Sequence, residues 1–164
     1  MEVRPARLND VPMLSAFFRE AWREAGPAAM GFSGATDQAI EEISSPEFLG
    51  RRLASPATYM VVAQEERALV GFASVRLLKD RDSELSGIVV LERARGKGVG
   101  TRLLRKAIDG ARKRGSLWMS VRTEVANARA VAFYKKSGFT ESGKAVEKVG
   151  RARVPVLVLV KKLR

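Results

Sequence analysis

The feature that most constrains this chain is a glycine-rich turn between an apolar run and a helical pattern. Residues 95–100 read Arg-Gly-Lys-Gly-Val-Gly, follow the apolar run 88–91 and lead into a helical pattern that begins near Val99. Glycine adopts positive φ values and lets a ligand approach the backbone closely. The first helical turn has N–H groups without intrahelical partners and a dipole that favours negative charge. A strand, a glycine turn and a helix N-terminus in this order predict a phosphate site.

Several phosphate-binding turns contain closely spaced glycines, and individual residues separate them. A P-loop requires a lysine directly before its Ser or Thr, but Gly100 precedes Thr101. A dinucleotide fingerprint requires glycine where Thr101 stands, with an acidic residue about 20 positions later, and both are missing. The pattern Arg/Gln-x-x-Gly-x-Gly/Ala is matched by Arg95, Gly98 and Gly100. A glycine turn that binds no ligand is the alternative.

A second segment matches a motif of the same kind of protein. Residues 127–139 fit the pattern Asn-x-x-Ala-x-x-Phe/Leu-Tyr-x-x-x-Gly-Phe. With the glycine turn about 30 residues before it, the chain resembles the GNAT superfamily of N-acetyltransferases. The resemblance runs from about Thr58 to Leu163, and the first 55 residues fit only by their general pattern. The matching positions of the second motif are Asn127, Ala130, Phe133, Tyr134, Gly138 and Phe139.

The resemblance implies a fold and an activity. The fold is the GNAT fold of the α/β (α+β) class: a mixed, mostly antiparallel sheet of about six to seven strands, splayed at its central strands, with about four flanking helices. One domain spans residues 1–164, with acceptor-side helices and a loop in 1–55 and an acetyl-CoA-binding core in 58–163. The implied activity is direct transfer of an acetyl group from acetyl-CoA to a primary amine.

By resemblance, two backbone segments hold the cosubstrate. The strand before the turn pairs with the pantetheine arm, and the turn binds the pyrophosphate. Asn127 caps the later helix and also touches the pantetheine. The Arg95 side chain either contacts a phosphate or caps the loop, and Lys97 acts as a long-range positive charge. The implied cosubstrate-binding residues are Ile88, Val89, Val90, Arg95, Gly96, Lys97, Gly98, Val99, Gly100, Thr101, Asn127 and Tyr134.

The same resemblance makes Tyr134 the general acid for the departing CoA thiolate. An ordinary phenol has a pKa of about 10, close to that of a thiol, so proton transfer is nearly balanced. A core tyrosine is the alternative interpretation. Neighbouring positions on a helix do not share a face, so one of the two adjacent residues Phe133 and Tyr134 is expected to point elsewhere.

The sequence does not fix the general base. Glu84 is the first candidate and Glu124 the second, with a surface ion pair as the alternative role of either residue, and a water relay is an equal option. Arg122 stands where the ribosomal-protein alanine acetyltransferases carry a glutamate base, which disfavours an N-terminal peptide as the acceptor.

An acidic stretch in the first third of the chain suits a cationic acceptor such as a polyamine, a lysine side chain or an aminoglycoside. A solvated helix face is the alternative explanation. The stretch consists of Asp37, Glu41, Glu42 and Glu47.

The composition excludes several mechanisms. The 164 residues include no cysteine and no histidine, so disulfides, thiolate nucleophiles, Ser-His-Asp chemistry and Cys/His zinc sites are ruled out, and no metal is expected. No apolar run approaches the ~20 residues of a membrane helix, and the start is unlike a signal peptide, so a cytoplasmic location is expected. Few amides and many arginines are typical of thermophiles, although a GC-rich genome also raises arginine.

Charge is unevenly distributed. Residues 1–92 contain 10 Lys/Arg and 14 Asp/Glu, whereas residues 93–164 contain 20 Lys/Arg and 4 Asp/Glu. A basic second half suits the phosphates of CoA. The excess exceeds the need of one nucleotide, but no aromatic residues are interleaved with it, so association with nucleic acid is a minor alternative. A CoA-binding sensor without activity is another alternative, and a homodimer is compatible with the sequence.

Periodicity and turn residues predict the elements. A first helix is expected from a cap at Asn9 or Asp10, residues 26–35 as a mobile loop, and then one helix or two short ones, with a start signal at Ser45. Pro155 predicts a sheet edge or a bulge. The expected strands are 2–7, 58–64, 69–79, 84–91, 117–123, 139–146 and 153–161, and the expected later helices are 99–114 and 128–136.

Overall fold

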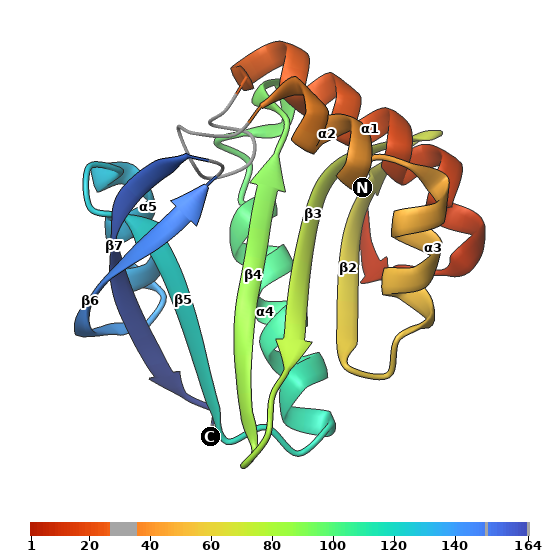
Figure 1. The fold of residues 1–164 in the computed structure, drawn as a ribbon. Helices are drawn as coiled ribbons and strands as arrows, with labels where there is room; N and C mark the ends of the chain where they lie inside the picture. Colours follow the sequence, from red (N-terminus) through yellow and green to blue (C-terminus); the bar gives the residue numbers. More distant parts are fainter. Residues whose placement is uncertain (27–35, 150, 164) are drawn as a thin grey trace.

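Seven strands form one mixed sheet in the order β1-β2-β3-β4-β5-β7-β6 (Figure 1). The computed structural model describes residues 1–26, 36–149 and 151–163. All neighbouring strands run antiparallel except β4 and β5, which run parallel. The strands are β1 (Glu2–Pro5), β2 (Thr58–Glu65), β3 (Ala68–Leu77), β4 (Asp82–Val90), β5 (Trp118–Glu124), β6 (Thr140–Val149) and β7 (Ala152–Lys162).

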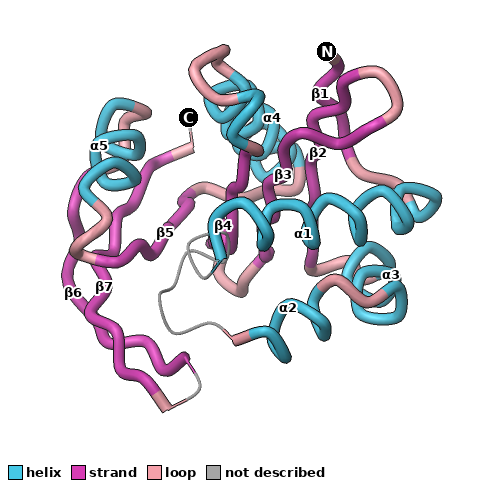
Figure 2. Tube along the Cα trace, turned by 90° about the horizontal axis from the view of Figure 1, so that it is seen from above, coloured by secondary structure: helices cyan, strands magenta, loops and turns pink. Residues whose placement is uncertain are grey.

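Helices cover both faces of this sheet (Figure 2). The first three pack a core that includes Phe17 and Phe72, and the last two pack a larger core that includes Leu103 and Leu159. The fold class expected from the sequence is therefore confirmed. The helices are α1 (Val11–Ala25), α2 (Asp37–Ile43), α3 (Pro46–Ala54), α4 (Val99–Lys113) and α5 (Ala128–Lys136).

The expected elements form, with ends that differ from the predictions by at most three residues. The described residues contain five α-helices instead of about four, because the segment after residue 36 divides into two short ones. Ser45 separates them: its Oγ accepts a hydrogen bond from the Phe48 N–H at 3.2 Å and so caps α3, whose first residue is Pro46. Of the predicted loop 26–35, all but Gly26 lies outside the described residues.

The parallel strands β4 and β5 pair along only part of their length. Their pairing covers Asp82–Leu85 on β4 and residues 118–121 on β5. Beyond Leu85 the two strands diverge (Figure 1), although β4 continues to pair with β3 as far as Val90. This confirms the predicted splay, and the edge of β4 that faces β5 is left unpaired there.

Pro155 does not mark a sheet edge, so that prediction was wrong. It lies in β7, between β5 and β6, and the register shift in the β6–β7 pair falls at Glu141, far from it. The Pro155 carbonyl accepts from the Val125 N–H at 3.1 Å, just past the end of β5. Both backbone groups of a residue in an antiparallel pair point to the same neighbour, so the Pro155 nitrogen also faces β5, where regular pairing has ended.

Helix α4 is held close to the sheet by a glycine. A Cβ placed on Gly110 would lie 1.8 Å from the ring of Tyr59 on β2, so no side chain fits at this position while the ring stays in place. The Arg114 guanidinium covers the same ring, with Cζ 4.1 Å from the ring centroid. These contacts with Tyr59 lie near the C-terminal end of α4, and because the helix is rigid they also fix the position of its first turn relative to the sheet.

Asp10 does not cap the first helix with its side chain, contrary to the sequence prediction. It occupies the cap position of α1, but its carboxylate accepts from both terminal nitrogens of Arg4 at 2.7 and 2.8 Å and from the Arg7 N–H at 2.7 Å. Asp10 is 2% exposed, and hydrogen bonding to Arg4 holds the pKa of Asp10 below its ordinary value. The ion pair joins α1 to the edge strand β1.

Asp10→Asn should lower the free energy of unfolding at pH 7 by about 3 kcal/mol, because it leaves the Arg4 charge without its buried partner. The depressed pKa means that this contribution is present above about pH 4 and is lost as the pH falls through the folded-state pKa. Urea unfolding at pH 7 and at acid pH measures both effects. The control Asp109→Asn breaks an exposed pair with Arg112 and should change stability by less than about 0.5 kcal/mol. Equal stability of Asp10→Asn and wild type at pH 7 would contradict this account.

Candidate active site

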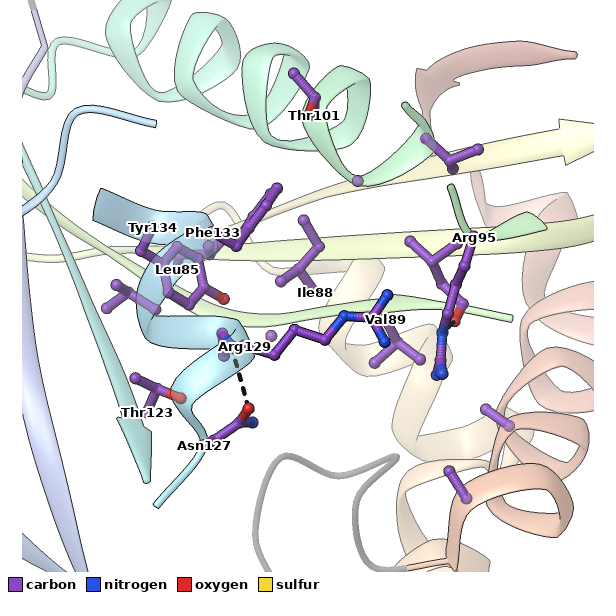
Figure 3. A pocket seen from close by; sticks show the side chains of 18 of the residues that line it. Leu85, Ile88, Val89, Arg95, Thr101, Thr123, Asn127, Arg129, Phe133 and Tyr134 are labelled. Carbon is purple, nitrogen blue, oxygen red and sulfur yellow. Dashed lines mark hydrogen bonds between the residues drawn. The ribbon is translucent and has the colours of Figure 1, made fainter. Parts of the chain in front are cut away.

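A cavity of about 720 Å³ opens where β4 and β5 diverge. Its walls are residues 84–90 of β4, the glycine turn, the start of α4, the end of β5 and α5 (Figure 3). Ala21 and Glu24 of α1 add a wall from the other face of the sheet. A volume of this order is typical of sites that enclose a small-molecule ligand, which are usually ~300–1,000 Å³.

The unpaired edge of β4 forms one side of the cavity. Ile88, Val89 and Val90 all line it, as the resemblance implies for a strand that pairs with an extended ligand. The Val90 carbonyl already has a side-chain partner, because the Nε of Arg95 donates to it at 3.0 Å. Arg95 thus caps the end of the strand, one of the two roles left open by the sequence, while its terminal nitrogens have no protein partner among the described residues.

The glycine turn has the geometry of an anion site. Gly96 and Gly98 have φ values of 73° and 76°, and a Cβ on either would have no atom within 4 Å. Gly98 is the cap residue of α4 and offers no side chain to the first helical N–H groups. A Cβ on Gly100 would meet only Phe133 at 3.7 Å and Val90 at 3.9 Å. The backbone N–H groups of this turn are therefore accessible to an anionic ligand.

Arginine side chains approach the cavity from two directions. Arg129 extends from α5 toward Val89, and Arg95 lies near the far end of the same strand (Figure 3). Both line the cavity, whereas Lys97 does not. Asn127, which also lines the cavity, caps α5 through an Oδ1 that accepts from the Ala130 N–H at 3.1 Å, as the sequence predicts.

Tyr134 projects into the cavity from α5 (Figure 3). The residue is 6% exposed, and its hydroxyl has no hydrogen-bond partner among the described residues. No fully enclosed side-chain oxygen in the described part of the chain lacks a partner, so this hydroxyl is open to the cavity. Burial raises the pKa of Tyr134 well above its ordinary value of about 10.

The expectation that one of the two residues Phe133 and Tyr134 points elsewhere was wrong. Both rings line the cavity, in an edge-to-face contact with centroids 5.3 Å apart. Phe139 packs on the other side of Tyr134 at 5.7 Å. The cavity also includes Gly100, which lies next to the Phe133 ring, so both neighbouring side chains of α5 can line it.

The carboxylates that line the cavity all have partners. Glu84 pairs with Arg76 at 3.0 Å, and Glu147 of β6 pairs with Arg122 of β5. Glu24 accepts from the Glu92 N–H at 3.0 Å. The second candidate base, Glu124, lies at the end of β5 and is not among the cavity-lining residues.

The acidic stretch predicted to attract a cationic acceptor lies away from the cavity. None of its four carboxylates lines the cavity. The Asp37 carboxylate accepts from the indole Nε1 of Trp22 at 2.9 Å, so it joins α2 to α1. The other three are exposed on α2 and α3. This supports the alternative explanation, a solvated helix face.

Residues 14–139 match the model of the Acetyltransferase (GNAT) family, which is more than half of the chain. The chain belongs to the GNAT acetyltransferase family. GNAT enzymes use acetyl-CoA, and the glycine turn, the open edge of β4 and the cavity between them fit a long ligand with phosphates at one end.

Relatives of this GNAT protein act on different amines. It is 37% identical over 101 residues to the N-alpha-acetyltransferase RimI of Mycobacterium tuberculosis, covering 60% of this chain and 62% of RimI. It is 27% identical over 146 residues to the aminoglycoside N(6')-acetyltransferase type 1 of Klebsiella aerogenes, covering 85% and 89%. The crystal structure of a ribosomal-protein-alanine N-acetyltransferase from Brucella melitensis has a TM-score of 0.76 at 27% identity over 99% of both chains. The protein is therefore an N-acetyltransferase whose acceptor these names do not define.

Sequence reasoning missed several residues of this GNAT cavity. Glu147 and Glu24 come from elements outside both motifs, and only the pairing of β6 with β7 and the packing of α1 bring them to the cavity. Arg129 could have been predicted, because it follows the Asn127 cap by two positions and its charged side chain is not expected in the apolar face of α5.

The described residues contain neither a candidate metal site nor a helix that could span a membrane. Within the described residues, no group of three or more Asp or Glu side chains is arranged to hold a metal ion. None of the helices in the described part of the chain is both long and apolar enough to cross a membrane.

Gly100→Glu should weaken acetyl-CoA binding more than tenfold while the protein stays folded. The new carboxylate would meet the phosphates at the start of α4, yet an acidic residue in a first helical turn is compatible with the helix, and its Cβ has room. Calorimetry with acetyl-CoA measures the affinity. Gly50→Glu makes the same change in α3, where a Cβ also has open space, and should leave the affinity unchanged. A folded Gly100→Glu protein with wild-type affinity would exclude the turn as the phosphate site.

Proposed function

We propose that this protein transfers an acetyl group directly from acetyl-CoA to a primary amine. The observation that carries the proposal is the convergence of three features on one cavity: the open edge of β4, the accessible backbone of the glycine turn and the unpartnered hydroxyl of Tyr134. The chain has no cysteine or histidine, so attack by the amine itself is the simplest route.

The described backbone groups account for how the cosubstrate is held. The pyrophosphate lies on the N–H groups of residues 96–101, because the Arg95 N–H already donates to the Glu92 carbonyl. The pantetheine arm lies along residues 88–90, and Asn127 contacts the same arm. Arg95 and Arg129 add positive charge from two sides of the cavity. Acetyl-CoA, once bound, supplies the activated acetyl thioester.

Tyr134 donates a hydrogen bond to the departing thiolate. A thiol has a pKa of about 8.5, and burial raises the pKa of the Tyr134 phenol above about 10, so complete proton transfer from the phenol is uphill. A neutral phenol in a cavity with little water is nevertheless a strong donor toward developing negative charge. Tyr134 therefore stabilises the thiolate, and the final proton comes from water.

Glu84 is the candidate that accepts the proton of the amine, directly or through a water. It lines the cavity one residue before β4 and β5 separate. One of its carboxylate oxygens bonds to Arg76, and the other has no partner among the described residues. Glu124 is a weaker candidate because it does not line the cavity.

Tyr134→Phe should lower kcat by about 10²–10³, the usual effect of removing one hydrogen-bond donor to developing charge, with little change in acetyl-CoA affinity. Because burial raises the pKa of the phenol, wild-type kcat should not fall through phenol ionisation up to about pH 10. Release of the CoA thiol with an amine panel measures kcat, and calorimetry measures the affinity.

The other tyrosine provides the control. Tyr59 is only 7% exposed, packs between β2 and α4, and does not line the cavity. Burial raises the pKa of Tyr59 as well. Tyr59→Phe should leave kcat unchanged. A kcat of Tyr134→Phe within threefold of wild type would remove the hydroxyl from the mechanism. Wild-type protein that binds acetyl-CoA but releases no thiol with any amine would favour a CoA-binding sensor.

A further inference from the structure

Arg52 of α3 is a half-buried cation that has no acidic partner among the residues that the structure describes. Its Nη2 donates to the Ser74 Oγ at 2.9 Å, and its Cζ lies 5.8 Å from the centroid of the Phe48 ring. It forms no ion pair with a carboxylate of the described residues. A guanidinium carries several N–H donors in a planar fork, so most donors of Arg52 have no protein acceptor in the part of the chain that the structure describes.

Arg52 does not line the cavity but is linked to it through two other residues. Its partner Ser74 is on β3, and the Ser74 carbonyl accepts from the Ser86 Oγ at 3.2 Å. Ser86 lines the cavity just past Leu85, the last β4 residue that pairs with β5. A contact chain of two residues therefore connects Arg52 to the place where the strands separate.

A second arginine stands on the same face of the sheet. Arg76 follows Ser74 by two positions on β3, so both side chains point toward the face that α3 covers. Arg76 pairs with Glu84, which lines the cavity. Burial first, and then the charge of Arg76, lower the pKa of Arg52, because a second positive charge disfavours the protonated guanidinium. The two arginines and the Glu84 carboxylate that pairs with Arg76 together carry a net positive charge.

We propose that Arg52 and Arg76 form a subsite for a carboxylate of the acceptor, so that the amine this protein acetylates belongs to a molecule that also carries a carboxylate. The carboxylate would occupy the free donors of Arg52, and the amine would lie toward Glu84 and the cavity. This rests on the proposed function and adds the acceptor class. It differs from the polyamine and aminoglycoside acceptors that the acidic stretch suggested, which carry amines but no carboxylate.

If Arg52 had a purely structural role, its substitution would have a different effect. A long side chain can cover apolar surface such as the Phe48 ring while its charge stays in water. In that case truncation would change stability and would affect all acceptors equally. A carboxylate subsite affects only acceptors with an acid group, because a bidentate arginine–carboxylate contact depends on both partners.

The test compares acceptors that differ only in the acid. CoA thiol release is measured for free amino acids against the corresponding amino acid amides, and for tetrapeptides with glutamate against glutamine at the second position. The expected result is a kcat/KM about tenfold or more higher for the acid of at least one pair, decreasing as salt rises. Preference within the first set identifies a free amino acid, and preference within the second identifies an acidic peptide.

Matched variants assign the preference to Arg52. Arg52→Gln should raise KM for the acid and bring the acid and the amide within threefold of each other, with kcat for the amide unchanged. Arg51→Gln changes the exposed neighbour on the same helix and should keep the preference. If Arg52→Gln does not fold, Arg52→Met retains the stem, and the wild-type comparison stands without either variant.

Three outcomes are distinguishable. Acetylation of amides and acids with equal kcat/KM in wild type would overturn the carboxylate subsite and leave the proposed function standing. An acid preference that persists in Arg52→Gln would also overturn the assignment to Arg52. No thiol release with any amine would overturn the proposed function itself.

Discussion

The incomplete pairing of β4 with β5 is the constraint on which the rest of this structure depends. These are the only parallel neighbours in the described sheet, and the chain passes between them through the glycine turn and α4. β5 remains paired with β7 along residues 118–124, and β4 remains paired with β3, so each strand follows its antiparallel partner and the two diverge past Leu85. The divergence opens the cavity, leaves an edge of β4 for a ligand and aims the start of α4 at one end of that edge.

The two faces of the sheet supply different parts of the site. Tyr134 and the start of α4 come from the face that holds the larger core. Arg52 of α3 and the β3 residues Ser74 and Arg76 lie on the other face. The cavity lies where β4 and β5 have separated, and in the proposed function an acceptor bound near Arg52 would reach the thioester from the side of the N-terminal helices. Acceptor choice and cosubstrate binding can therefore depend on separate residues.

Much of this arrangement could be predicted from the sequence because it is local. The helices and strands follow from periodicity, and the glycine turn and the Asn127 cap follow from short motifs whose geometry is set by adjacent residues. What failed depends on contacts between distant segments. The side chain of Asp10 binds Arg4 instead of capping α1, because β1 brings a guanidinium within reach. Glu147 joins the site through the pairing of β6 with β7.

Pro155 has a consequence for how the sheet assembles. Strands that slip by two residues keep the same side chains facing the core, so hydrophobic pattern alone does not prevent such a slip. In the native register the Pro155 nitrogen faces β5 at Val125, just past the last ladder pair Glu124–Val156, so the missing N–H lies outside the regular ladder. A shift that moved Pro155 further along β5 would set its ring against a carbonyl that needs a donor. The proline thus acts as a register stop, keeping Val158 opposite Arg122 and the wall of the cavity in its native position.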